Sequence, residues 1–197
     1  GTVRAEERGW RWVIAGILAS TTAMVAMAHG EGWEDTYELH RIWVPLVTVS
    51  CLLNVYSLEQ LSKSDGHRWT MLVALAGLGG PTALAAANYG SLFQFALAMI
   101  AATVAVYAFS AFRAWNAGYW TAAIPATAGA AGITAAARFN SYTTYPAWML
   151  GLMLFVPAIV VAIDFAIRRQ PGWVRFVVSG LVSTAAVTAC VWRVLLG

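Results

Sequence analysis

The sequence predicts an all-α integral membrane protein with seven transmembrane helices, forming one domain over residues 1–197. Of the residues, 60% are hydrophobic and only 11% are charged, whereas a soluble domain carries roughly 25% charged residues. Seven apolar runs are close to the roughly 20 residues that a helix needs to cross a bilayer. Each run must be helical in hydrocarbon, because a helix satisfies its own backbone hydrogen bonds.

The predicted spans follow one another with short breaks that contain Gly, Asn, Asp or Pro, as helical hairpins do. They cover residues 10–28, 42–61, 69–87, 92–112, 120–137, 145–167 and 173–196. The first run ends near Ala26-Met27-Ala28, which resembles a signal-peptide cleavage site, but we interpret it as a span. Pro81, Pro125 and Pro157 lie inside predicted helices and are expected to kink them.

The odd-numbered spans begin alike, with a cation, a polar turn, a Trp and then a run rich in Ala and Gly. Trp10, Trp69, Trp120 and Trp173 mark these entries at spacings of 59, 51 and 53 residues. A period near fifty residues predicts about three and a half parallel helical-hairpin repeats. The alternative is that Ala-rich membrane helices resemble one another by composition alone.

The odd and even spans differ in bulk. The odd spans place small residues three and four positions apart, for example Gly77 with Gly80 and Gly129 with Gly132, which allows close helix approach. The even spans carry larger side chains, such as Phe93 and Trp148. We therefore expect the odd spans to form an inner layer and the even spans to face lipid.

The orientation follows from the cations. If the amino terminus is cytoplasmic, nine of the twelve Lys and Arg residues lie on the inner side and three on the outer side. The positive-inside rule then predicts a cytoplasmic amino terminus and an outer carboxyl terminus, in a prokaryotic inner or plasma membrane. The inner cations are spread over four segments, which disfavours nucleic-acid binding. The expected partners are the lipid bilayer and either further copies of this chain or another membrane protein.

The pattern of Trp entries and small-residue runs resembles the HdeD-like acid-resistance membrane proteins, which are tandem transmembrane hairpins. The resemblance lies in Gly118/Trp120, Gly172/Trp173, Ala15-Gly16-Ile17-Leu18 and Ser179-Gly180-Leu181-Val182. The family typically has six spans, whereas seven are predicted here. Its outer turns usually carry an Asn-Pro-Gly-like element, which the outer turns of this chain lack. The resemblance implies a stress-related membrane protein and brings no catalytic residues.

The first outer loop is the longest, running from His29 to Arg41. Its possible metal ligands are His29, Glu31, Glu34, Asp35, Glu38 and His40. Oxygen and imidazole donors at this density suit a divalent cation such as Cu, Zn or Mn. The alternative is an acidic solvated cap with Arg41 and Arg138 as partners, because HExxH spacing is absent. No other cofactor is predicted.

Polar residues within spans are the remaining candidates, because charges in lipid are often functional. Asp164 and Glu59 each precede a cation by four residues, so helical ion pairs with Arg168 and Lys63 explain them without a function. The candidate polar path consists of Asn54, Gln94, Tyr107 and Asp164. The alternative is that these side chains bond across helices and hold them together.

Several chemistries are disfavoured. Lys63, the only Lys, lies outside the spans, which disfavours a retinal protein, and GxSxG, HExxH and Walker motifs are absent. The first function class is a non-catalytic membrane component, stress-related or accessory, that acts through helix packing. The second is a channel or carrier for a small solute or ion, and a membrane enzyme is the third. A carrier should show a continuous polar path, and a packing component should show a dry centre.

Overall fold

The computed structural model describes residues 2–26, 33–63, 68–85, 90–113, 118–139 and 146–196. These residues form seven helices and no strand, so the all-α prediction is confirmed. The helices are α1 (Thr2–Ala26), α2 (Trp33–Lys63), α3 (Arg68–Ala85), α4 (Gly90–Arg113), α5 (Gly118–Phe139), α6 (Ala147–Ala166) and α7 (Gly172–Leu196). Each predicted span corresponds to one helix.

Two segments of the described residues are long and apolar enough to cross a membrane. They are Arg41–Leu61 in α2 and Gly172–Cys190 in α7. The apolar segments Gly90–Ala105 and Gly151–Ala166 are shorter. The further crossings and the orientation of the chain remain predictions.

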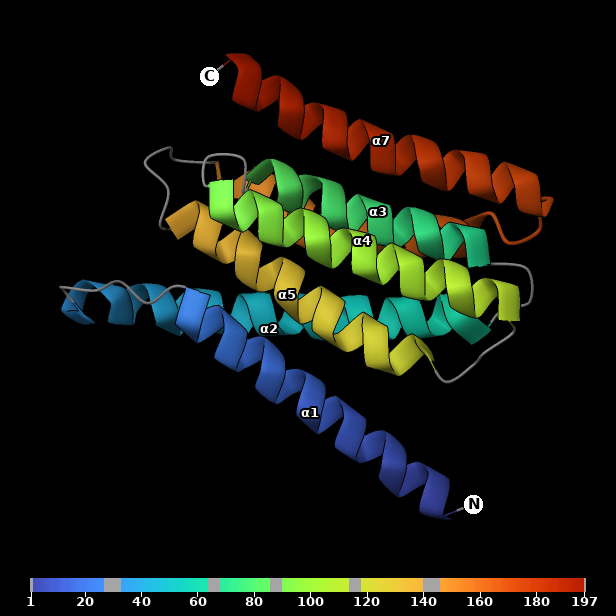
Figure 1. Cartoon of the computed structure of the whole chain (residues 1–197), viewed down its shortest axis with the longest axis horizontal. Coiled ribbons are helices and arrows are strands. Elements are labelled where there is room, and N and C mark those ends of the chain that lie inside the picture. Colours follow the sequence, from blue (N-terminus) through green and yellow to red (C-terminus); the bar gives the residue numbers. More distant parts are fainter. Residues whose placement is uncertain are drawn as a thin grey trace.

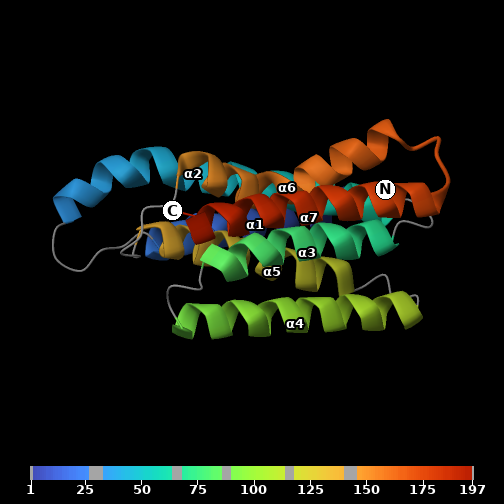
Figure 2. The same ribbon diagram turned by 90° about the horizontal axis from the view of Figure 1, so that it is seen from above.

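The helices lie side by side and alternate in direction along the chain (Figure 1). A middle layer has the order α7, α3, α5, α1, which places α7 and α1 at opposite edges (Figure 1). Helices α2 and α6 cover one face of this layer, and α4 covers the other, against α3 and α5 (Figure 2). The second helices of the three hairpins are therefore not placed equivalently, and the arrangement gives the predicted repeat no support.

The expected inner layer needs a correction. The odd helices do form the middle layer, but α1 and α7 lie at its edges and expose large apolar side chains such as Ile17 and Leu181. Among the described residues, α3 and α5 expose none. Helices α2 and α6 bury Leu58 and Val160 almost completely, because each packs against several neighbours rather than facing outward alone.

Glycines on α3 and α5 receive side chains from their neighbours. A Cβ at Gly79 would lie 2.7 Å from Ile100 of α4, and a Cβ at Gly77 would lie 2.6 Å from Val156 of α6. On α5, a Cβ at Gly132 would collide with Thr22 of α1. These helices pack closely because the missing side chains leave room for neighbouring ones.

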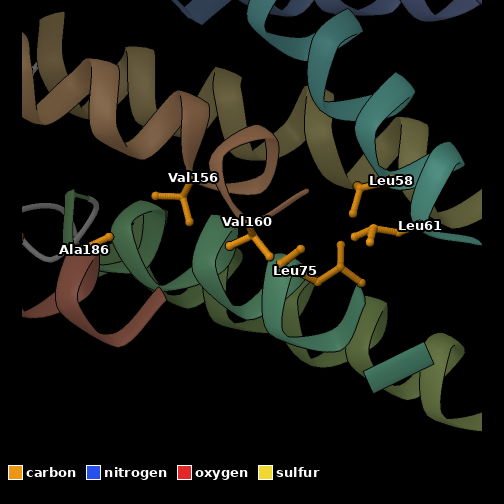
Figure 3. Packing of buried hydrophobic residues seen from close by; sticks show 7 residues of the cluster. Leu58, Leu61, Leu75, Val156, Val160 and Ala186 are labelled. Atoms are coloured by element: carbon orange, nitrogen blue, oxygen red, sulfur yellow. The ribbon is translucent and has the colours of Figure 1, made fainter. Parts of the chain in front are cut away.

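The largest described apolar cluster joins four helices (Figure 3). It contains Leu58 and Leu61 of α2, Ala74 and Leu75 of α3, Val156 and Val160 of α6, and Ala186 of α7. A second cluster joins α1, α2, α5 and α6 around Val47 and Leu154. These two clusters therefore lie between the middle layer and the α2–α6 face, and a smaller cluster of Ala96 and Ile133 lies on the α4 side.

Helix α2 begins at Trp33, so residues 33–41 of the predicted first outer loop are helical. The helix has 31 residues, which at 1.5 Å each span about 46 Å, against about 30 Å of bilayer hydrocarbon. Its first turns extend beyond the neighbouring helices (Figure 1). From Trp33 to Arg41 the sequence has no Gly or Pro, and the early Glu34 and Asp35 favour a helix amino terminus.

Candidate functional site

Some of the buried hydroxyl groups in the described residues bond within their own helices. Ser50 donates to the Val47 carbonyl at 2.8 Å, and Thr82 donates to the Leu78 carbonyl at 2.9 Å. Such bonds to the preceding turn satisfy a hydroxyl in an apolar environment without a partner helix. These side chains are therefore accounted for by local structure.

Two hydroxyl pairs connect helices. The Thr82 and Thr134 hydroxyls lie 3.2 Å apart between α3 and α5, and those of Ser20 and Thr48 lie 3.1 Å apart between α1 and α2. Hydrogen bonds of this kind hold membrane helices together at about 0.6 kcal/mol each. They support the interpretation of span hydroxyls as packing contacts.

Asn54 joins α2 to α6. Its Nδ2 donates to the Leu154 carbonyl at 2.6 Å, and the side chain is almost fully buried. Pro157 of α6 has no backbone N–H, so the carbonyl of Met153, the residue before Leu154, lacks its helical donor. Among the described residues, Asn54 Oδ1 and the buried Ser179 Oγ have no hydrogen-bond partner.

Asp164 pairs with Arg175 of α7, so the predicted pair with Arg168 is wrong. Arg175 Nε donates to Asp164 Oδ1 at 2.9 Å, and its Nη2 donates to Oδ2. Both side chains are buried. Helix α6 ends at Ala166, so Arg168 lies beyond the helix that a spacing of four requires. The guanidinium of Arg168 instead lies 4.9 Å from the ring centroid of Phe165.

The structure does not assemble the predicted polar path. Asn54 bonds to α6 at Leu154, ten residues before Asp164, a separation of about 15 Å along the helix. Val156 and Val160 occupy this stretch of α6 together with Leu58 of α2, and all three are almost fully buried (Figure 3).

The other two path candidates lie on α4, which covers the opposite face of the middle layer from Asn54. The Gln94 side chain is exposed there, and the Tyr107 side chain lies outside the described part of the chain. Glu59 is buried near the end of α2, and the side chain of Lys63, its predicted partner, is not among those described.

The proposed metal ligands fall largely outside the described structure. His29 and Glu31 lie between the described ranges, and Glu34, Asp35, Glu38 and His40 lie on α2 with side chains that are not described. Within the described residues, no three His, Cys, Asp or Glu side chains are grouped so as to hold a metal ion.

A shallow groove of about 710 Å³ lies between α6 and α7, with lining residues that include Trp148, Leu181, Thr188 and Trp192. A second space, of about 10 Å³ between α3, α4 and α5, is at the lower limit for a single water molecule. Neither space contains the Asp164–Arg175 pair or Asn54. In comparisons with protein families, curated proteins and solved structures, no match to this chain was found.

Proposed function

We propose that the protein is a non-catalytic, multi-pass membrane component with seven spans that acts through helix packing. On this proposal the amino terminus is cytoplasmic, the carboxyl terminus is outside, and the bilayer is that of a prokaryotic inner or plasma membrane. The apolar segments of α2 and α7 support membrane insertion. The partners are lipid and either copies of this chain or another membrane protein.

One observation carries the proposal: apolar side chains fill the space between the buried polar groups. Leu58, Val156 and Val160 lie between the Asn54 amide and the Asp164 carboxylate. A dry, closely packed interior suits a component that shapes or stabilises a membrane assembly, because an aqueous path needs groups that replace the hydration of a solute. The resemblance to HdeD-like proteins adds a role in stress resistance, which includes acid.

The membrane location is tested by extraction. The full-length chain should remain with the membrane after alkaline carbonate treatment and should enter solution with detergent. Release by carbonate alone would contradict the proposed location.

The stress-related role is tested by survival. Cells that lack the gene should survive acid exposure less well, and the wild-type gene should restore survival. Gly151→Ala should also restore it, because a Cβ at Gly151 meets nothing within 4 Å. Gly77→Leu should not, because a Cβ there already meets Val156 and Ser183. Equal survival with and without the gene would reject the stress-related role.

A second candidate, a channel or carrier, is favoured by the two buried polar atoms without partners, Asn54 Oδ1 and Ser179 Oγ. Buried polar atoms are normally satisfied, often by ordered water, and water at both positions would begin a wet path. Flux of protons, potassium or a small solute through proteoliposomes tests this candidate. A channel or carrier would be established if the wild type shows flux, and if Asn54→Leu and Ser179→Ala each abolish that flux. Ser50→Ala is the control and should leave the flux intact, because the Ser50 hydroxyl bonds to the Val47 carbonyl.

A membrane enzyme or a metal protein that uses the residues from His29 to His40 is the third candidate. Metal analysis of the purified protein tests it directly. Stoichiometric Cu, Zn or Mn that is lost on changing His29 and His40 to Ala together would support this candidate.

A further inference from the structure

We propose that the connection between α6 and α7 binds the headgroup of an anionic phospholipid, an inference that rests on the membrane location proposed above. The binding surface consists of the exposed side chains of Phe165, Arg168, Arg169 and Trp173, and we call it the α6–α7 basic surface. The ligand chemistry is a phosphate group attached to acyl chains.

Backbone hydrogen bonds hold this connection in a defined turn. The Ile167 N–H donates to the Ile163 carbonyl at 3.0 Å, and the Gln170 N–H donates to the Ile167 carbonyl at 2.9 Å. Helix α6 ends at Ala166 and α7 begins at Gly172, so Arg168 and Arg169 lie between the two helix ends. Their side chains are exposed at this end of the bundle.

The two arginines give this surface a positive charge, and no acidic residue follows them in the sequence. Asp164 is the last acidic residue of the sequence, and it is buried in the ion pair with Arg175. Among the described residues, neither Arg168 nor Arg169 has an acidic partner. A guanidinium group suits a phosphate because it donates two parallel N–H bonds to phosphate oxygens.

Exposed aromatic rings beside the arginines indicate a lipid rather than a soluble phosphate. Phe165 is 66% exposed and Trp173 is 71% exposed. Trp side chains are favoured at the level of lipid headgroups, where apolar and polar surroundings meet, and the wholly apolar Phe ring favours the acyl chains next to them. A free phosphate ion would leave these rings in water, whereas the acyl chains of a lipid would cover them.

The net charge of the surface selects among lipids. The phosphatidylcholine headgroup brings its own cation, which the two arginines repel, whereas the phosphatidylglycerol headgroup carries none. Each Arg or Lys near an anionic membrane surface raises the binding constant about five-fold. We therefore expect the surface to prefer phosphatidylglycerol over phosphatidylcholine.

The test measures the thermal unfolding midpoint of the full-length protein in a nonionic detergent with added lipid. Phosphatidylglycerol should raise the midpoint at concentrations where phosphatidylcholine and sodium phosphate do not. Changing Arg168 and Arg169 to Gln together should weaken the apparent phosphatidylglycerol affinity by about 25-fold. The change of both residues to Lys should weaken the affinity less than the change to Gln, because Lys keeps the charge but loses the paired N–H donors.

Arg41→Gln is the matched control, because Arg41 is also an exposed arginine but lies within α2, toward the other end of the bundle. The proposal is overturned if phosphatidylcholine stabilises the wild type equally, if sodium phosphate does so, or if Arg41→Gln weakens phosphatidylglycerol binding as much. The wild-type comparison of lipids decides the question even if the glutamine variant fails to fold. Failure of the membrane location itself shows separately, as release by alkaline carbonate.

Discussion

At the scale of single residues, the Asp164–Arg175 pair stands out because each charge lies at an unfavourable helix end. Asp164 is in the last turn of α6, where the helix dipole is negative, and Arg175 is in the first turn of α7, where it is positive. Each charge is opposed by its own helix, so the mutual bidentate contact must offset both effects. The pair therefore fixes the α6–α7 hairpin rather than stabilising either helix alone.

We expect Asp164→Asn to destabilise the protein by about 3–5 kcal/mol, because the buried guanidinium of Arg175 loses its paired carboxylate. Changing Asp164 to Leu and Arg175 to Met together should cost less than either single change, because both charges leave the interior. Unfolding midpoints in detergent of Asp164→Leu, of Arg175→Met and of the double variant measure this coupling. Additive effects would show that the two side chains act independently.

Asn54 allows a second test, in which an apolar replacement is milder than a polar one. Asn54→Leu loses one hydrogen bond to the Leu154 carbonyl but also removes an unpartnered buried oxygen, so we expect a change within about 1 kcal/mol. Asn54→Asp keeps the size of the side chain but places a carboxylate against the Leu154 carbonyl. It should therefore lower the free energy of unfolding several-fold more than Asn54→Leu does. Thermal unfolding that ranks Asp as milder than Leu would contradict the observed donor geometry.

The sequence could predict which residues of this candidate site are unusual, but not their partners. Asn54 and Asp164 stand out as polar groups in apolar runs. The partner of Asp164 depends on where α6 ends: the helix stops at Ala166, before Arg168, and the carboxylate pairs with Arg175 of α7. Arg175 is a second charged residue in a predicted span, 173–196, but the sequence does not show that it faces Asp164.

At the scale of helices, the glycines show why α3 and α5 occupy the centre of the middle layer. Gly79 receives Ile100 of α4, whereas Gly77 receives Val156 of α6, so α3 is approached closely from both faces of the layer. On α5, Gly129 receives Met99 of α4 and Gly132 receives Thr22 of α1. Small residues identify close-packed helices in the sequence, but the neighbour depends on the tertiary arrangement.

We expect Gly77→Ala to destabilise the protein by about 1–3 kcal/mol through overpacking. The new Cβ would lie 2.6 Å from Val156 Cγ1 and 2.9 Å from Ser183 Oγ, and a helical valine has little rotamer freedom with which to yield. Gly151→Ala is the control, because a Cβ there meets nothing within 4 Å, and it should stabilise by up to about 1 kcal/mol. Unfolding midpoints that do not separate the two variants would contradict this packing.

The positions of the helices follow from apolar runs, but their ends do not. The run criterion placed the second element at residues 42–61, whereas α2 spans Trp33–Lys63. Glu34, Glu38 and His40 are polar and end an apolar run, yet a helix continues through them because backbone bonding does not require apolar side chains. Hydropathy therefore predicts the segment suited to hydrocarbon and not the full helix.

At the scale of the whole molecule, the layer order α7, α3, α5, α1 separates the two ends of the chain. Helices α1 and α7 lie at opposite edges, each with an exposed apolar face (Figure 1). The sequence pattern predicted that odd helices form one layer. The sequence pattern could not give the order of the odd helices within the layer. An even helix can connect its two odd neighbours across either face of the layer, and the helix propensity of the residues is the same in both cases.

The alternating helices also place chain ends and connections at two ends of the bundle, which differ in charge. The amino terminus and the α6–α7 connection lie at one end, and the carboxyl terminus lies at the other (Figure 1). The first end carries nine of the twelve cations of the sequence, and cytoplasmic segments of membrane proteins are enriched in Lys and Arg.

A reporter fused before Thr2 should therefore be cytoplasmic, and one fused after Leu196 should be outside. A reporter fused after Ile167, in the α6–α7 connection, should again be cytoplasmic, which checks α7 as a separate crossing. Reporters after residues 167 and 196 that lie on the same side would mean that α7 does not cross the membrane.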